Sequence, residues 1–141
     1  MTSRQTYILD SFALLALFRN ELAADAVAGL LRRADAGEVQ LMMTAVNLAE
    51  VVYRTIRERG FERAQEVLAH IQAYTIHMVD VDRPLALAAA NLKGLHRISF
   101  ADCLAAALAQ RESAAIVTGD RDFRQVEGLV TIEWLPRAKS Q

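Results

Sequence analysis

Short apolar runs of strand length alternate along this chain with longer segments rich in Ala, Leu, Glu and Arg. The runs are "TYIL" (6–9), "VQLMMT" (39–44), "IHMVDV" (76–81), "AAIVTG" (114–119) and "LVTIEWL" (129–135). The segments between them have high helix propensity and predict helices at 21–36, 45–58, 61–74, 84–95 and 100–112. Strand, helix and strand repeated in this order predict an α/β fold, with a mainly parallel sheet covered by helices on both faces.

Length and composition limit the class of protein further. A chain of 141 residues is enough for a single domain, 1–141, in which about 136–141 reads as a tail. The net charge is −1, so nucleic-acid binding would need a local basic patch rather than a global field. Cys103 is the only cysteine, which excludes an internal disulfide and a cysteine-based zinc cage. No signal peptide or membrane span is recognisable, so we expect a soluble cytoplasmic protein.

Acidic residues recur where the predicted strands end. Asp10 and Asp120 directly follow the first and fourth strands, and Glu50 lies in the helix after the second. Asp102 stands near the start of the helix that leads into the fourth strand. Ligand sites of parallel sheets form beyond the carboxyl ends of the strands, so we expect these four acids to share one pocket. Oxygen-only ligands favour Mg²⁺ or Mn²⁺, ions that commonly hold phosphates and activate water.

Each acid also has a structural explanation, and the sequence leaves both open. Asp10 has the residue type of a helix N-cap, and Asp102 follows Ser99 at capping-box spacing. Glu50 could pair with Arg54 one turn later on the same helix face. Asp120 could cap a short helix that runs through Phe123. In such a helix the side chains of Asp120 and Asp122 would point in different directions, whereas in an extended chain they would lie on the same side.

The order of these motifs resembles a known family. "YILDSFALLALF", "TAVNLAEVVYR", "ISFADCLAAALAQ" and "IVTGDRDF" are similar in order and spacing to the acidic motifs of PIN-domain ribonucleases, especially VapC-type toxins, over about Tyr7 to Trp134. The resemblance implies a five-stranded parallel sheet in an α/β/α arrangement and a Mg²⁺- or Mn²⁺-dependent endoribonuclease acting on tRNA or ribosomal RNA. It also implies a VapB-like antitoxin partner and a homodimer.

The resemblance also implies roles for individual residues. Asp10, Asp102 and Asp120 would bind one metal, with Glu50 completing it or binding a second; these four are the expected catalytic acids. Asp122 matches a less regular fifth acid. The expected supporting residues are Ser11, Asn47 and Thr118.

Other features are less specific. Arg54, Lys93 and Arg97 are candidates for contacts with RNA phosphates. Apolar stripes on 45–56 and 61–74 suit either a dimer or antitoxin contact or ordinary core packing. Phe123 and Trp134 are expected in the core.

Two rival functions keep the same fold: a non-catalytic RNA-binding or interaction domain, and a nuclease that acts without an antitoxin. A phosphohydrolase or receiver domain on a similar sheet is less well supported. The first-strand motif "DSF" lacks the second acid that those proteins place near the first.

Overall fold

A computed structural model describes residues 4–137 and contains one five-stranded sheet, in which all neighbouring strands are parallel. The strand order is β3-β2-β1-β4-β5. The strands are β1 (Gln5–Leu9), β2 (Val39–Thr44), β3 (His77–Val79), β4 (Ala115–Thr118) and β5 (Thr131–Trp134). The predicted fold class is confirmed, and each strand falls within one residue of its predicted run or inside it.

Helices connect the strands. They are α1 (Ser11–Phe18), α2 (Ala24–Asp35), α3 (Ala45–Arg59), α4 (Phe61–Ala73), α5 (Arg83–Leu95), α6 (Phe100–Glu112) and the 3₁₀ helix η1 (Arg121–Val126). The five helices predicted from composition are present. Helix α1 is absent from the prediction because its sequence, "SFALLALF", is apolar almost throughout and shows no polar face.

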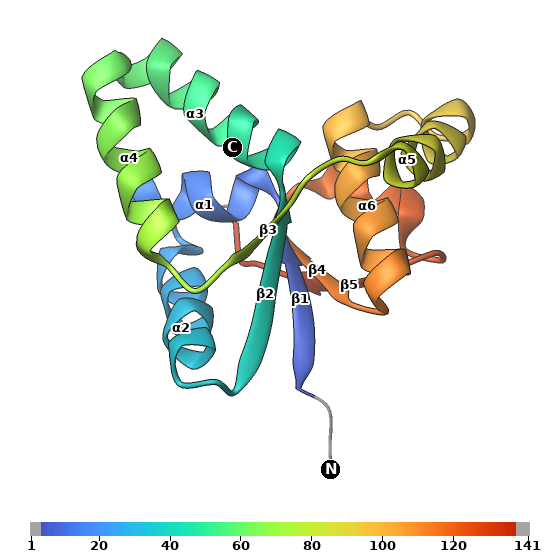
Figure 1. Ribbon diagram of the computed structural model, residues 1–141, viewed down its shortest axis with the longest axis horizontal. Coiled ribbons are helices and arrows are strands. Elements are labelled where there is room, and N and C mark those ends of the chain that lie inside the picture. The colour runs from blue at the N-terminus through green and yellow to red at the C-terminus, as the bar shows by residue number, and fades with distance from the viewer. Residues whose placement is uncertain (1–3, 138–141) are drawn as a thin grey trace.

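The helices form two layers, one on each face of the sheet (Figure 1). Buried residues of α1 to α4 pack on one face, and those of α5, α6 and η1 pack on the other. Successive side chains along a strand point to opposite faces, so the strands contribute residues to both cores. Ile8 and Ile116 pack on the α6 side, while Leu9 and Val117 pack on the α1 side. Helix α6 is buried from Asp102 to Ala109, as expected for a helix at the centre of its layer.

The register of the parallel strands brings their carboxyl ends to one edge. Leu9 pairs with Val117, so Asp10 and the residues after Thr118 leave the sheet together. Thr118 in turn pairs with Trp134 of β5. Thr44, at the end of β2, caps α3 by accepting a hydrogen bond from the Asn47 N–H at 3.0 Å. Three chain segments therefore turn into helices at the edge where the acids were expected.

Of the two aromatic residues expected in the core, Phe123 and Trp134, only Phe123 lies there. Phe123 is fully buried, whereas Trp134 is 40% exposed, so its assignment to the core is wrong. The reason is topological: β5 is an edge strand at the end of the sheet order, where a side chain has a neighbouring strand on one side only. Of the expected tail, residues 138–141 lie outside the described part of the chain, and Arg137 contacts Phe12 and Gly119.

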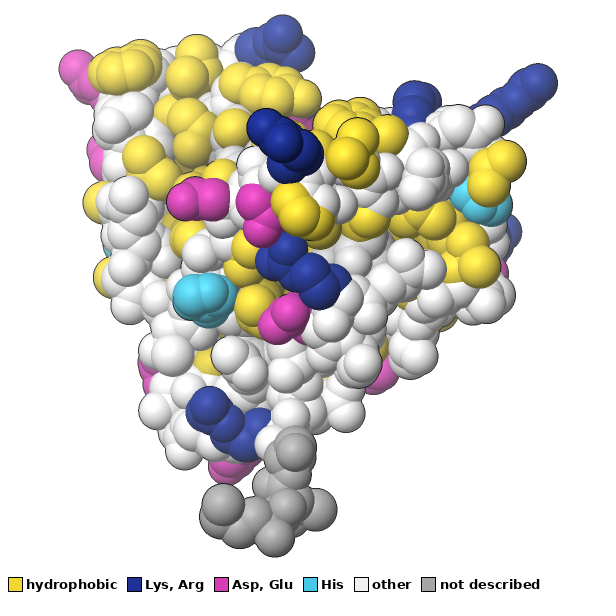
Figure 2. Space-filling view, turned by 45° about the vertical axis from the view of Figure 1, so that its right-hand side comes forward, with side chains coloured by type: hydrophobic (Ala, Val, Ile, Leu, Met, Phe, Trp, Pro, Cys, Tyr) yellow, Lys and Arg dark blue, Asp and Glu magenta, His cyan; other side chains and the backbone are white. Residues whose placement is uncertain are grey.

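The apolar stripe of α3 serves the core and also reaches the surface. Val51 is fully buried, while Val46, Tyr53 and Ile56 are exposed, as is Phe61 at the start of α4. Figure 2 shows apolar side chains gathered in the upper part of the molecule, over the region of α3 and α4. Along residues 4–137, no helix has the length and apolar character needed to cross a membrane.

Candidate active site

Asp10 and Thr118 form the centre of the site, where β1 and β4 end side by side. Asp10 is 1% exposed and caps α1, because its Oδ1 accepts a hydrogen bond from the Ala13 N–H at 3.1 Å. Its Oδ2 accepts a hydrogen bond from the Thr118 hydroxyl. The same hydroxyl oxygen accepts from the Asp120 N–H at 3.0 Å. Thr118 is fully buried, and its hydroxyl oxygen connects Asp10 to the backbone of Asp120.

Three carboxylates converge next to this pair. Asp102, Asp120 and Asp122 each offer an oxygen, and these atoms all lie within 4.8 Å of one another. Asp120 caps η1 by accepting from the Asp122 N–H at 2.9 Å, and Ser99 caps α6 by accepting from the Asp102 N–H at 3.1 Å. Ser99 and Asp120 therefore act as helix caps, as the sequence suggests, although the side chain of Asp120 accepts from Asp122 and not from Phe123. The short helix does not drive Asp122 away from Asp120.

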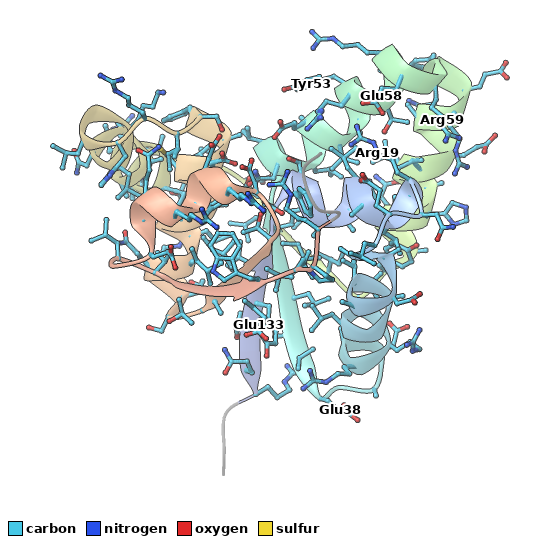
Figure 3. All side chains as sticks on the ribbon, turned by 180° about the vertical axis from the view of Figure 1, so that it is seen from behind. Arg19, Glu38, Tyr53, Glu58, Arg59 and Glu133 are labelled. Carbon is cyan, nitrogen blue, oxygen red and sulfur yellow. The ribbon has the colours of Figure 1, made fainter. Side chains whose placement is uncertain are left out.

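Glu50 reaches the site from α3 and is held there by Ser11. The Ser11 hydroxyl donates to Glu50 Oε1 at 2.8 Å, while Arg54 Nη1 lies 3.9 Å from Oε2, at the outer limit of an ion pair. At the far end of α3, Glu58 binds Arg19, which follows α1, through two hydrogen bonds (Figure 3). Helix α3 is thus attached to the α1 segment at two points, which fixes the direction from which Glu50 approaches.

Asn47 connects the two helical layers above the sheet edge. It is fully buried, and its Nδ2 donates to the Ala101 carbonyl oxygen of α6 at 3.3 Å. The Thr44 hydroxyl donates to Asn47 Oδ1, so the amide is satisfied at both ends. The residue after Ala101 is Asp102. Asn47 therefore sets how closely α3, with Glu50, approaches the acid-bearing end of α6.

The electrostatics of the pocket are those of crowded carboxylates. The pKa of Asp10 is raised to about 8, mainly by burial; the hydrogen bonds from Thr118 and Ala13 oppose this rise, and the charges of Asp102 and Asp120 add to it. Burial, followed by the charge of Asp120, raises the pKa of Asp102 to about 7, with smaller contributions from Glu50 and Asp122. Asp10 and Glu50 lie outside the three-carboxylate group, but the charge of Glu50 acts on Asp102, and the charges of Asp102 and Asp120 act on Asp10. Such a pocket attracts a cation, which would relieve the repulsion.

These pKa values predict how the metal-free protein responds to pH. Because both are raised above the ordinary 3.8, the folded state binds more protons than the unfolded state between about pH 4 and pH 8. The free energy of unfolding should therefore fall as pH rises through this window, by on the order of a few kcal/mol. Urea unfolding in EDTA at pH 5 and pH 8 measures the difference. The double variant Asp10→Asn with Asp102→Asn should lose most of this pH dependence. If its free energy of unfolding changed with pH as much as that of the wild type, the pKa assignments would be contradicted.

Gly119 fills a position with no room for a side chain. A Cβ atom built there would lie 2.5 Å from the Phe12 ring, and it would also crowd Arg137. Arg137 Nη1 donates to the Gly119 carbonyl oxygen at 3.1 Å, and its guanidinium lies 5.9 Å from the centre of the Phe12 ring. Phe12 and Arg137 thus support the loop between Thr118 and Asp120. No local sequence pattern indicates these contacts, since Phe12 lies far from both Gly119 and Arg137 along the chain.

The three candidate RNA-binding residues occupy different positions. Arg54 stands beside Glu50, as described. Lys93 Nζ donates to the Ile98 carbonyl oxygen at 2.7 Å, so it already serves the turn between α5 and α6. The Arg97 backbone is held by Gln125 of η1 through two hydrogen bonds, which do not involve its guanidinium group. Contact of these three with RNA stays a prediction.

Comparison with known families identifies the family of this chain. The family model for the PIN domain matches residues 7–129, and the chain therefore belongs to the PIN domain family. No curated protein sequence matches the chain.

Solved structures of toxin–antitoxin proteins have a similar fold. VapBC2 from Rickettsia felis, bound to a DNA fragment from its promoter, gives a TM-score of 0.72 at 20% identity, covering 94% of this chain and 100% of the other. VapC20 from Mycobacterium tuberculosis, a toxin that cleaves the sarcin–ricin loop, gives 0.70 at 18% identity, covering 92% and 99%. DNA-bound VapBC from Salmonella typhimurium gives 0.69 at 18% identity, covering 92% and 97%. At these identities the likeness establishes a shared fold.

Proposed function

We propose that this protein is a metal-dependent endoribonuclease and the toxin of a type II toxin–antitoxin pair. One observation carries the nuclease assignment: Asp102, Asp120 and Asp122 present oxygens within 4.8 Å of one another, beside two further acids at the carboxyl edge of the sheet. The pocket satisfies the donor chemistry of Mg²⁺ or Mn²⁺, which bind carboxylate oxygens. Membership of the PIN family and the similarity to VapC20, which cleaves the sarcin–ricin loop, favour RNA as the substrate.

The acidic residues and their hydrogen-bond partners have separate roles in this proposal. Asp102, Asp120 and Asp122 would hold the cation, and Asp10 and Glu50 would complete its negative surroundings. A divalent ion bound there would supply a lowered pKa for water and would offset the charge that develops on a phosphate under attack. The Thr118 hydroxyl connects one oxygen of Asp10 to the Asp120 N–H, and the Ser11 hydroxyl binds Glu50.

The toxin assignment rests on the likeness to VapBC structures. We propose a VapB-like antitoxin that covers the acidic pocket, a homodimer that uses the exposed apolar residues of α3, and action in the cytoplasm. Val46, Tyr53 and Ile56 are the candidate dimer residues, because exposed apolar side chains along one helix suit contact with a second copy. A small reading frame overlapping the upstream end of the gene, encoding a DNA-binding N-terminus, would support the pair; its absence would favour a nuclease without an antitoxin.

Metal dependence tests the central assignment. Purified protein incubated with tRNA and ribosomal RNA should cleave in Mg²⁺ or Mn²⁺ and stop in EDTA, with activity restored by excess cation. The same ions should raise the unfolding temperature of the wild-type protein, because a ligand that binds only the folded state stabilises it. Asp102→Asn should reduce both effects, whereas Asp25→Asn, an exposed acid in the first turn of α2, should change neither. RNA binding without cleavage in every cation would favour the non-catalytic alternative.

A further inference from the structure

A separate cavity opens beside the loop that carries the acids. It has a volume of about 370 Å³ and lies between η1 and the end of β5. Its lining residues are Gly119, Arg121, Arg124, Glu127, Trp134, Leu135 and Arg137. Figure 3 shows η1 and β5 on the near side of the molecule in that view.

The charge of this cavity differs from that of the acidic pocket. Three of the lining side chains are guanidinium groups, and Glu127 is the one acid among the described residues that line it. Within residues 4–137, neither Arg121, Arg124 nor Arg137 forms an ion pair. Arg121 and Arg124 are therefore available for the bidentate hydrogen bonds that phosphate groups accept, whereas Arg137 already donates to the Gly119 carbonyl oxygen. In a chain of net charge −1, this is a local basic patch of the kind that RNA binding requires.

Trp134 adds an aromatic surface to the same cavity. It is the only tryptophan of the chain, and 40% of its surface is exposed although the residue ends a strand of the sheet. Its strand register places it beside Thr118. An exposed aromatic ring next to arginines is the combination that binds single-stranded nucleic acids, since bases stack on the ring while phosphates bind the cations.

The cavity and the acidic pocket share one short segment. Gly119 lines the cavity and precedes Asp120, while Arg121 stands between Asp120 and Asp122. The Gly119 carbonyl oxygen is fixed by Arg137, so the wall between the two sites is held from the cavity side. A strand whose phosphate lies at the acids would therefore extend over Arg121 directly into the cavity.

We propose that this cavity binds single-stranded RNA next to the scissile phosphate, with Arg121 and Arg124 holding a phosphate and Trp134 stacking on a base. The proposal rests on the proposed nuclease function and adds to it the path of the RNA chain. Arg137 has a second role in supporting Gly119, so the experiment uses the other residues.

The test measures binding of a fluorescently labelled single-stranded oligoribonucleotide to the full chain in EDTA, which separates binding from cleavage. RNA should quench the emission of Trp134, and inorganic polyphosphate should bind without quenching it. Trp134→Ala should weaken RNA binding by about tenfold or more, and Trp134→Phe should recover part of the loss. Arg121→Gln and Arg124→Gln should each weaken binding and lower the slope of log K against log salt by about 0.7.

Arg33→Gln is the matched control, because it removes one positive charge from the end of α2, where Arg33 pairs with Glu38. Figure 3 shows Glu38 at the lower end of the molecule, away from η1 and β5. RNA that binds without quenching Trp134, with Arg124→Gln no weaker than Arg33→Gln, would overturn the proposal and leave the nuclease assignment intact. Failure of wild-type protein to cleave any RNA in Mn²⁺ would count against the nuclease assignment instead.

Discussion

Replacing Asp10 with asparagine is expected to lower RNA cleavage by about 10²-fold or more. The carboxylate is buried beside Asp102 and Asp120, both of which act on its charge, so its removal takes one negative charge from the pocket that would bind the cation. Initial rates of cleavage at saturating Mn²⁺, compared between wild type and Asp10→Asn, measure the effect. A variant that retains full activity would contradict the role of Asp10.

The loss should come without damage to the fold. Asparagine is as good an N-cap as aspartate, so the hydrogen bond to Ala13 at the start of α1 is retained. The Thr118 hydroxyl can rotate to accept from the new amide. Asp10→Asn should therefore unfold near the wild-type temperature, and in EDTA at pH 8 no lower than wild type, since no buried charge remains at this position. Asp25→Asn serves as the control for removal of an exposed carboxylate.

Replacing Thr118 with valine should lower cleavage by about 10- to 100-fold, although the Thr118 side chain is uncharged and is not one of the proposed cation ligands. Valine has the same shape and lacks the hydroxyl, which leaves Asp10 Oδ2 and the Asp120 N–H without their shared partner. The hydrogen bond from Thr118 lowers the pKa of Asp10, so its loss should raise that pKa further. The pH profile of cleavage should shift upward, with part of the activity recovered at alkaline pH.

Thr118→Ser is the matched control because it keeps the hydroxyl and removes only a methyl group. It should retain most of the activity and the wild-type pH profile. The valine variant should also lose about 1–3 kcal/mol of stability, the cost of a buried polar group left unpaired. Equal pH profiles for the valine and serine variants would show that Thr118 fills space and does not position Asp10.

The sequence was sufficient for the architecture because two simple patterns determine it. The five strand-length apolar runs correspond to the five strands, and the parallel arrangement follows from the helices between them. The acids were expected at one edge because the carboxyl ends of parallel strands meet there, and Asp102, Asp120 and Asp122 lie together at that edge. Assignment of particular acids to the metal stays a prediction.

Other features depended on contacts that local patterns do not encode. Helix α1 is surrounded by apolar neighbours, so its sequence shows no amphipathic period. The exposure of Trp134 follows from the position of β5 at the end of the strand order, which composition does not reveal. The hydrogen bond from Asn47 to Ala101 joins residues 54 positions apart, and a sequence of alternating elements does not indicate which helices meet across the sheet edge.

The contact between Asn47 and Ala101 has a consequence for how the protein unfolds. Glu50 belongs to the helical layer on one face of the sheet and Asp102 to the layer on the other, and this one amide bridges them at the site. A cation bound by Asp102, Asp120 and Asp122 would lie beside this bridge and would attract Glu50 from the opposite layer. Metal binding should therefore strengthen the contact between the two layers at this edge of the sheet, and not only the layer that holds the ion.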